Sequence, residues 1–179
     1  MSGKLTLISS ATASGSANVS FTSGIDSTYD EYVFYFVDIN PATDVQKLTF
    51  QTSTDGGSSY AVNLTSTSFR ATHTEAGADG SLDYDTGNDI ANSTSFCPLS
   101  GTIGNGADEC AAGELHLFSP SSTTRVKHWT STFNLVEASN ATVNQFNSGY
   151  FNTTTAINAI QFKMGSGNFD GNIYLFGVG

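Results

Sequence analysis

The feature that most constrains this chain is the spacing of its apolar residues, which tend to alternate with polar ones from end to end. Segments such as 47–53 and 157–164 show the period of two that is typical of half-buried β-strands. No segment of about eleven or more residues repeats the i, i+3, i+4, i+7 spacing of an amphipathic helix. The sequence therefore predicts an all-β fold.

The arrangement of the strand-like segments favours one antiparallel β-sandwich domain, most simply a jelly roll. The 179 residues suffice for a single core. Turn residues separate about eight to ten strand-like segments, a spacing typical of sandwiches. Residues 1–10 are interpreted as an N-terminal arm or a first strand, and residues 72–112 as a long, loop-rich middle insertion.

Three local patterns give more specific expectations. The most hydrophobic segment, Tyr29 to Ile39, predicts a central strand covered on both faces. The small residues Ala11 to Ala17 predict a turn. Asp55-Gly56, between the alternating segments 47–53 and 60–64, predicts a hairpin.

The segment Ser53 to Tyr60 resembles the Asp-box of sialidases, which is a turn motif and not a catalytic element. In that motif the aspartate, here Asp55, accepts backbone N–H groups while the aromatic residue, here Tyr60, lies beneath the turn. A structural role is therefore expected, and the motif gives no indication of glycan hydrolysis.

The charge of the chain bears on its partners. The net charge is −10, and the six Lys and Arg residues are scattered, which disfavours nucleic-acid binding. No apolar run approaches the ~18 residues of a membrane span. Charged residues make up 12% of the chain, and Ser, Thr, Asn and Gly are abundant. Such a hydroxyl-rich exterior suits virion, cell-surface and secreted proteins.

Cysteines and carboxylates leave two alternatives open. Cys97 and Cys110 either form a disulfide within the insertion or remain free thiols. Oxygen-rich loops can hold calcium, but the spacing here does not match an EF-hand, so the alternative is a solvated acidic loop. The carboxylates concerned are Asp79, Asp83, Asp85 and Asp89.

Residues that often carry catalysis lack a catalytic pattern in this chain. His73, His116 and His128 do not occur at metal-binding spacings, although His116 and His128 lie on expected strands. No serine lies in a G-x-S-x-G motif. We therefore expect a protein that is not an enzyme and needs no cofactor.

Aromatic residues suggest a binding role instead. Tyr and Trp on a sheet face can stack on sugars or anchor an interface, and Trp129, Tyr84 and Tyr150 are the candidates. Trp129 alternates with Lys127 and Ser131, so it is expected to face outward with them. The alternative for each aromatic residue is a place in the core.

Three segments together resemble small β-sandwich virion proteins of tailed bacteriophages. They are residues 25–44 (IDSTYDEYVFYFVDINPATD), residues 48–57 (LTFQTSTDGG) and the closing residues 157–178, which end in GNIYLFGV. The matched positions are strand cores and turns, so the resemblance assigns no binding residue. The resemblance implies a setting on the outer surface of a phage particle.

Within that group, a separate chain of this length resembles a capsid decoration or cement protein. The resemblance implies that it binds the major capsid protein or other virion proteins, stabilises the shell and assembles as a trimer. The alternative is the receptor-binding tip of a tail or head fibre, with a host-surface glycan as its ligand.

Overall fold

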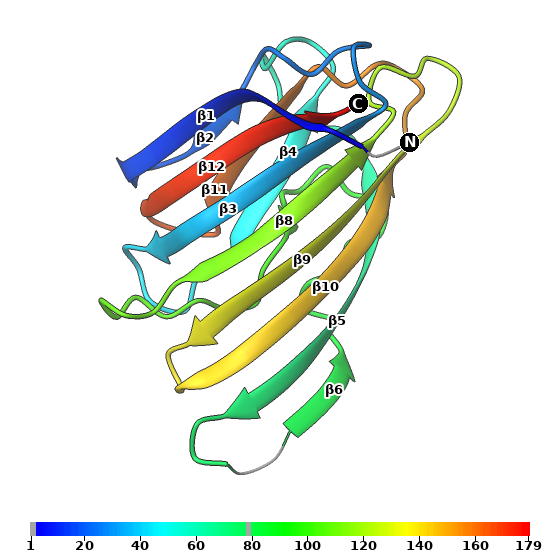
Figure 1. Ribbon diagram of the computed structural model, residues 1–179. Helices are drawn as coiled ribbons and strands as arrows, with labels where there is room; N and C mark the ends of the chain where they lie inside the picture. The colour runs from blue at the N-terminus through cyan, green and yellow to red at the C-terminus, as the bar shows by residue number, and fades with distance from the viewer. Residues whose placement is uncertain (1–2, 78–79) are drawn as a thin grey trace.

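The computed structural model describes residues 3–77 and 80–179 and confirms an antiparallel β-sandwich. These residues form a large sheet and a smaller sheet behind it (Figure 1). None of them forms a helix that could cross a membrane. The strands are β1 (Leu5–Ser16), β2 (Val19–Phe21), β3 (Glu31–Pro41), β4 (Leu48–Ser53), β5 (Leu64–Thr74), β6 (Gly80–Tyr84), β7 (Cys97–Pro98), β8 (Ala111–Phe118), β9 (Lys127–Glu137), β10 (Ala141–Phe151), β11 (Ala159–Met164) and β12 (Phe169–Val178).

The two sheets differ greatly in size. The larger has eight strands in the order β1-β12-β3-β8-β9-β10-β5-β6, and the smaller has four in the order β2-β11-β4-β7. The twelve strands exceed the eight to ten expected, and β2 and β7, of three and two residues, are the shortest. The jelly-roll connectivity stays a prediction, since the strands divide eight to four and not into two equal sheets.

The hydrophobic core lies between the sheets and is rich in aromatic residues. Phe162 on β11 contacts both Phe34 and Phe36 on β3, with ring centroids 5.3 and 5.0 Å apart. Further along, Phe50 on β4 packs edge-on against Trp129 on β9 at 4.9 Å. These edge-to-face contacts are the geometry that aromatic pairs prefer.

The predicted turn at Ala11 to Ala17 is wrong, because β1 continues to Ser16. Two register irregularities along β1, between Leu7 and Ser9 and between Ala13 and Ser16, let the strand continue beside β12. The small side chains allow this course, and Ala13 is buried against the core.

The hairpin predicted at Asp55 is also wrong, because β4 and β5 belong to different sheets. The turn itself has the expected structure. The Asp55 carboxylate accepts hydrogen bonds from the Ser59 amide at 3.0 Å and the Ser53 hydroxyl at 2.6 Å. Tyr60 lies beneath it, since its hydroxyl is 2.7 Å from where a side chain at Gly57 would begin. The chain then crosses to the large sheet.

The hydrophobic strand β3 is covered on one face only, contrary to the prediction. Tyr32, Phe34 and Phe36 point into the core and are almost completely buried. The residues between them point to the opposite side, where no second layer of the described chain lies. There Val33 is 2% exposed between its cross-strand neighbours Phe176 and His116, whereas Tyr35 is half-buried and Val37 is 40% exposed. The outer face of β3 therefore lacks a covering layer and is exposed toward Val37.

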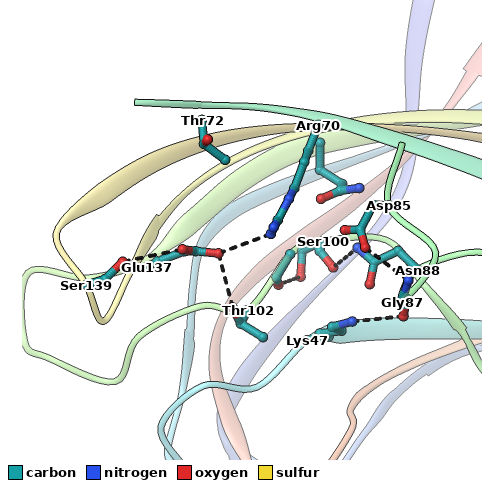
Figure 2. A network of polar contacts seen from close by, with 12 residues as sticks. Lys47, Arg70, Thr72, Asp85, Gly87, Asn88, Ser100, Thr102, Glu137 and Ser139 are labelled. Carbon is teal, nitrogen blue, oxygen red and sulfur yellow. Dashed lines mark hydrogen bonds and ion pairs between the residues drawn. The ribbon is translucent and has the colours of Figure 1, made fainter. Parts of the chain in front are cut away.

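The segment between β5 and β8 is the loop-rich insertion, with β6 and β7 as its strands. Its loops attach to the inner side of the large sheet. Asn88 is buried and donates to the Ser100 carbonyl at 3.0 Å, and Lys47 reaches the Gly87 carbonyl at 2.9 Å (Figure 2). In the same network Arg70 of β5 lies 3.7 Å from Glu137 of β9. The insertion also bonds directly to the large sheet, because the Ser66 amide donates to the Ile90 carbonyl at 2.8 Å and Asn147 donates to the Leu99 carbonyl at 2.8 Å, so its loops cover part of the inner side.

Candidate binding face

The side of the large sheet that points away from the small sheet, here called the outer face, carries nearly all the exposed large apolar side chains of the described residues. Because side chains alternate along a strand, the inward set fills the core and the other set faces solvent. Among the described residues, the exposed large hydrophobic side chains lie on this face except for Val45, which is in the β3–β4 loop. Those on the outer face are Leu5, Leu7, Val37, Phe69, Leu82, Tyr84 and Tyr150.

One group, the β1–β3 patch, consists of Leu5, Leu7, Tyr35, Val37 and Phe176. Leu7 is 55% exposed and lies opposite Phe176 of β12. Phe176 in turn contacts Tyr35 of β3, with ring centroids 5.5 Å apart. The patch thus joins three neighbouring strands, at the edge of the sheet formed by β1.

A second group, the β5–β6 patch, lies at the opposite edge and consists of Phe69, Leu82, Tyr84 and Phe146. Phe69 and Phe146 stack with ring planes 13° apart and centroids at 4.9 Å. Tyr84 is the cross-strand neighbour of Phe69, and Leu82 is 72% exposed. Exposed apolar groups of this kind mark sites of interaction with other molecules.

A shallow depression, here the Tyr150 depression, lies beside the stacked phenylalanines. It has a volume of about 280 Å³. The ring of Tyr150 lies 6.2 Å from that of His128, at an angle of 53°. The remaining side chains that point into it are hydroxyls, of which Thr67 and Ser148 are hydrogen-bonded at 3.1 Å. The outer-face residues that line it are Thr65, Thr67, His128, Thr130, Ser148 and Tyr150.

His116 lies between two carboxylates on the same face. Its Nδ1 is 2.6 Å from Oε1 of Glu31 on β3, and its Nε2 is 3.6 Å from Oε1 of Glu114. His128 is not part of this group, and His73 lies opposite Thr142 near the far end of the sheet. The structure therefore does not bring the histidines together.

Trp129 does not face outward, so this prediction is wrong. Its side chain is 1% exposed, and Lys127 and Ser131 are buried on the same side of β9. Trp129 alternates with Lys127 and Ser131 as expected, but all three lie on the core side of β9, so the polar neighbours do not mark the solvent side. Opposite the indole lies Gly149, where an added Cβ would be 2.9 Å from the ring, so glycine leaves room for it.

Lys127 can be buried because backbone carbonyls accept hydrogen bonds from its ammonium group. The ammonium Nζ donates to the carbonyls of Thr155 at 2.7 Å and Thr153 at 3.2 Å. Burial lowers the pKa of Lys127 from its usual value. These carbonyls come from the segment between β10 and β11, far along the chain, so they give no local signal in the sequence.

The other two aromatic candidates are exposed but lie apart. Tyr84 is 56% exposed on β6, while Tyr150 is 36% exposed on β10. The Tyr84 hydroxyl donates to Asp89 at 2.8 Å, and this hydrogen bond raises the pKa of Tyr84. Tyr84 belongs to the β5–β6 patch and Tyr150 to the depression.

The calcium candidates do not converge in the described part of the chain. Asp79 lies outside the described residues. Asp83 is exposed opposite Arg70. The Asp85 carboxylate accepts a hydrogen bond from the Gly87 amide, and the Asp89 carboxylate accepts one from the Tyr84 hydroxyl. Within residues 3–77 and 80–179, no three His, Cys, Asp or Glu side chains gather in a way that could hold a metal ion.

The two cysteines are free thiols in the structure. Cys97 is buried in β7 of the small sheet, and Cys110 lies just before β8 of the large sheet. Burial raises the pKa of the Cys97 thiol to about 12, although a hydrogen bond to Ser66 opposes this. Burial also raises the pKa of Cys110.

The sequence reasoning missed a group of buried polar side chains beneath β5 and β10. Asn147 donates to the Leu99 carbonyl at 2.8 Å and accepts from Ser68 at 2.7 Å. Gln145 donates to the same Ser68 hydroxyl at 2.6 Å. A signal for their burial is present in the sequence, because Gln145 and Asn147 lie two and four residues after Val143 and so point to the same, buried side of β10.

The chain matches no protein-family model, and neither curated proteins nor solved structures show significant similarity to it.

Proposed function

We propose that this protein is a non-catalytic structural component of a phage virion, a decoration or cement protein on the outer capsid surface. It binds the major capsid protein or a neighbouring virion protein through the β1–β3 patch. The observation that carries the proposal is the exposed apolar surface of the β1–β3 patch, with Val37 of β3 and Leu7 of β1 exposed on the outer face.

The energetics support a binding role for this patch. Burial of apolar surface contributes about 25 cal/mol per Å². A strand with the composition of β3 is usually covered on both sides. A partner that covers the outer side therefore gains free energy without any rearrangement of the sandwich. The phage setting is supported by the resemblance of residues 25–44, 48–57 and 157–178 to phage virion proteins.

A bound decoration protein stabilises the capsid shell through the thermodynamic linkage between binding and shell opening. A protein that binds the closed shell and not the separated subunits raises the free energy of opening by RT ln(1 + [L]/Kd) per site. At a free concentration about 100 times Kd this is about 2.7 kcal/mol per site. Many such sites across the seams between capsomers add up to a large effect.

The test is to mix the purified protein with undecorated capsids of the same phage. We expect saturable binding at a fixed stoichiometry and a higher temperature of capsid disruption. Capsids of an unrelated phage are the control and should neither bind the protein nor gain stability. Absence of both effects on the cognate capsid would exclude the decoration function.

A second candidate function, recognition of a host-surface glycan by a fibre tip, is favoured by the Tyr150 depression. An aromatic ring can cover the C–H face of a pyranose, and the surrounding hydroxyls of Thr67 and Ser148 can exchange hydrogen bonds with sugar hydroxyls. The net charge of −10 favours a neutral glycan over an anionic one.

Binding to host cells separates this candidate from the first. If the glycan function is correct, binding is lost with competing host polysaccharide and with Tyr150→Ala, whereas Thr142→Ala on the same face leaves it unchanged. Capsid binding that does not respond to polysaccharide would favour decoration.

A further inference from the structure

Strand β6 is an open edge of the large sheet. It pairs with β5 on one side, and no other described strand pairs with it on the other side. All five residues, Gly80 to Tyr84, are exposed. Edge strands in stable monomers are commonly protected by lysine, proline or a bulge. β6 has none of these and carries a single charged residue, Asp83.

The hydrogen-bond register shows which backbone groups of β6 are open. Tyr84 lies opposite Phe69, and the next amide, that of Asp85, donates to the Ser68 carbonyl at 2.9 Å. Tyr84 and Phe69 therefore form a non-hydrogen-bonded pair, and the two kinds of pair alternate along an antiparallel ladder. It follows that Gly80, Leu82 and Tyr84 direct their N–H and C=O groups away from β5.

We propose that β6 pairs antiparallel with β6 of a second copy of this chain, with the two-fold axis at Leu82. Leu82 then exchanges both backbone hydrogen bonds with Leu82 of the second copy, and Gly80 does so with Tyr84. This register uses the three residues whose backbone groups are open. The two large sheets become one continuous sheet. The inference does not depend on which surface the protein covers, and it gives a two-fold pair in place of the trimer that the resemblance implies.

The charge pattern selects this register over its neighbours. An axis at Asp83 would place the two Asp83 carboxylates directly opposite each other, in the closer, non-hydrogen-bonded type of pair, and like charges there destabilise a sheet. The axis at Leu82 places Asp83 opposite Ser81 instead. With an axis at Ser81, Gly80 would pair with Leu82 of the second copy. The open backbone groups of Tyr84 would then have no partner within β6.

The apolar side chains support the same arrangement. Leu82 and Tyr84, at 72% and 56% exposed, are the most exposed large hydrophobic residues of the described chain. On the outer face the two Leu82 side chains meet at the axis, and Tyr84 lies over Gly80 of the second copy. An aromatic ring next to a strand glycine restores the contacts that glycine lacks. The β5–β6 patches of the two copies thereby join.

Sedimentation of the purified protein from micromolar to millimolar concentration tests the pairing. We expect a reversible monomer–dimer equilibrium. Leu82→Lys places two positive charges at the axis and removes the leucine contact, so it should weaken the dimer about tenfold or more. Val45→Lys is the matched control, because Val45 is also an exposed apolar residue, 51% exposed, but lies outside the sheet. It should leave the dimer unchanged.

Cross-linking tests the register. Hydrogen-bonded antiparallel partners have Cα atoms about 5.5 Å apart, within the range of a disulfide. Leu82→Cys should therefore form an intermolecular disulfide on mild oxidation. In the Ser81→Cys control the two Cα atoms are about 8 Å apart, given strand spacing and rise, and a disulfide is not expected. The unsubstituted protein, oxidised in the same way, shows how much cross-linking comes from Cys97 and Cys110.

Three results would overturn the proposal. They are a monomer at every concentration, a trimer, or a dimer that tolerates Leu82→Lys. Preferential cross-linking through Ser81→Cys would reject the two-fold axis at Leu82 even if a dimer forms. Because residues 81 and 82 are exposed, each variant is expected to fold, which its thermal unfolding midpoint checks.

Discussion

At the scale of single residues, polar side chains in this sandwich depend on partners that are distant in the sequence. Lys127 donates to the Thr153 and Thr155 carbonyls, and Asn147 to the Leu99 carbonyl. Each of these carbonyls belongs to a loop between strands. Since an unpaired buried polar group costs about 1–3 kcal/mol, such bonds fix the loops to the sheet.

Asp55 gives a pH-dependent prediction. Hydrogen bonds from Ser53 and Ser59 lower the pKa of its carboxyl to about 2 from 3.8. The stabilisation is therefore present above pH ~4 and is lost as the pH falls through the folded-state pKa. Asp55→Ala should lower the midpoint of thermal unfolding at pH 7, and the difference from the parent should shrink toward pH ~2.

The control for this experiment is Asp108→Ala, which removes the same charge from an exposed loop position. It should change the midpoint little at any pH. A difference at Asp55 that stays constant from neutral pH to pH ~2 would show that its ionised form is not the source of the stabilisation.

The thiols give a second prediction at this scale. The thiolate is the reactive form, so burial and the raised pKa of about 12 should protect Cys97. Under native conditions without reductant, an alkylating reagent should modify Cys110 first and Cys97 only after unfolding. Mass spectrometry of the labelled peptides distinguishes the two. If neither thiol reacts in denaturant without reductant, the two cysteines form a disulfide, which would contradict the prediction.

At the scale of elements, β9 illustrates how a strand divides its side chains between core and solvent. Trp129 packs on Phe50 in the core, whereas its neighbour Thr130 is exposed on the outer face. We expect Trp129→Ala to destabilise the protein by about 3–5 kcal/mol and Thr130→Ala by about 0.5 kcal/mol or less. Denaturant unfolding of both variants measures this. Equal effects would contradict the inward orientation of Trp129.

The strands themselves were largely predictable from the sequence. Alternation and turn residues indicate β8 to β12 to within a few residues, because each half-buried strand carries its own period-two signal. The pairing of strands was not predictable in the same way. The Asp55 turn has local chemistry that suits a hairpin, but the chain that follows it crosses to the other sheet, a choice made by long-range packing.

The candidate site was harder to predict than the strands. A polar residue can be outward, as Thr130 is, or inward and paired with a distant carbonyl, as Lys127 is, and the sequence does not distinguish them. Conversely, the composition of β3 indicates cover on both faces, yet this chain supplies cover on one. Which side of β3 stays without a covering layer depends on how the two sheets pack, a long-range property that the local composition does not encode.

At the scale of the whole molecule, the sandwich is asymmetric. The four-stranded sheet and the insertion cover the inner side of the eight-stranded sheet, and the outer side has no cover from the described chain (Figure 1). The two apolar patches lie at opposite edges of this open side. In our account the β1–β3 patch contacts the capsid, and the β5–β6 patch joins two copies.

The most direct test of the central claim compares Leu7→Asp with Val45→Asp in saturation binding to undecorated capsids. Both residues are exposed, at 55% and 51%, so neither change should alter folding, but only Leu7 lies in the β1–β3 patch. We expect Leu7→Asp to weaken capsid binding about tenfold or more and Val45→Asp to leave it unchanged. Equal binding by both variants, or a loss confined to Val45→Asp, would contradict the assignment of the outer face as the capsid-binding surface.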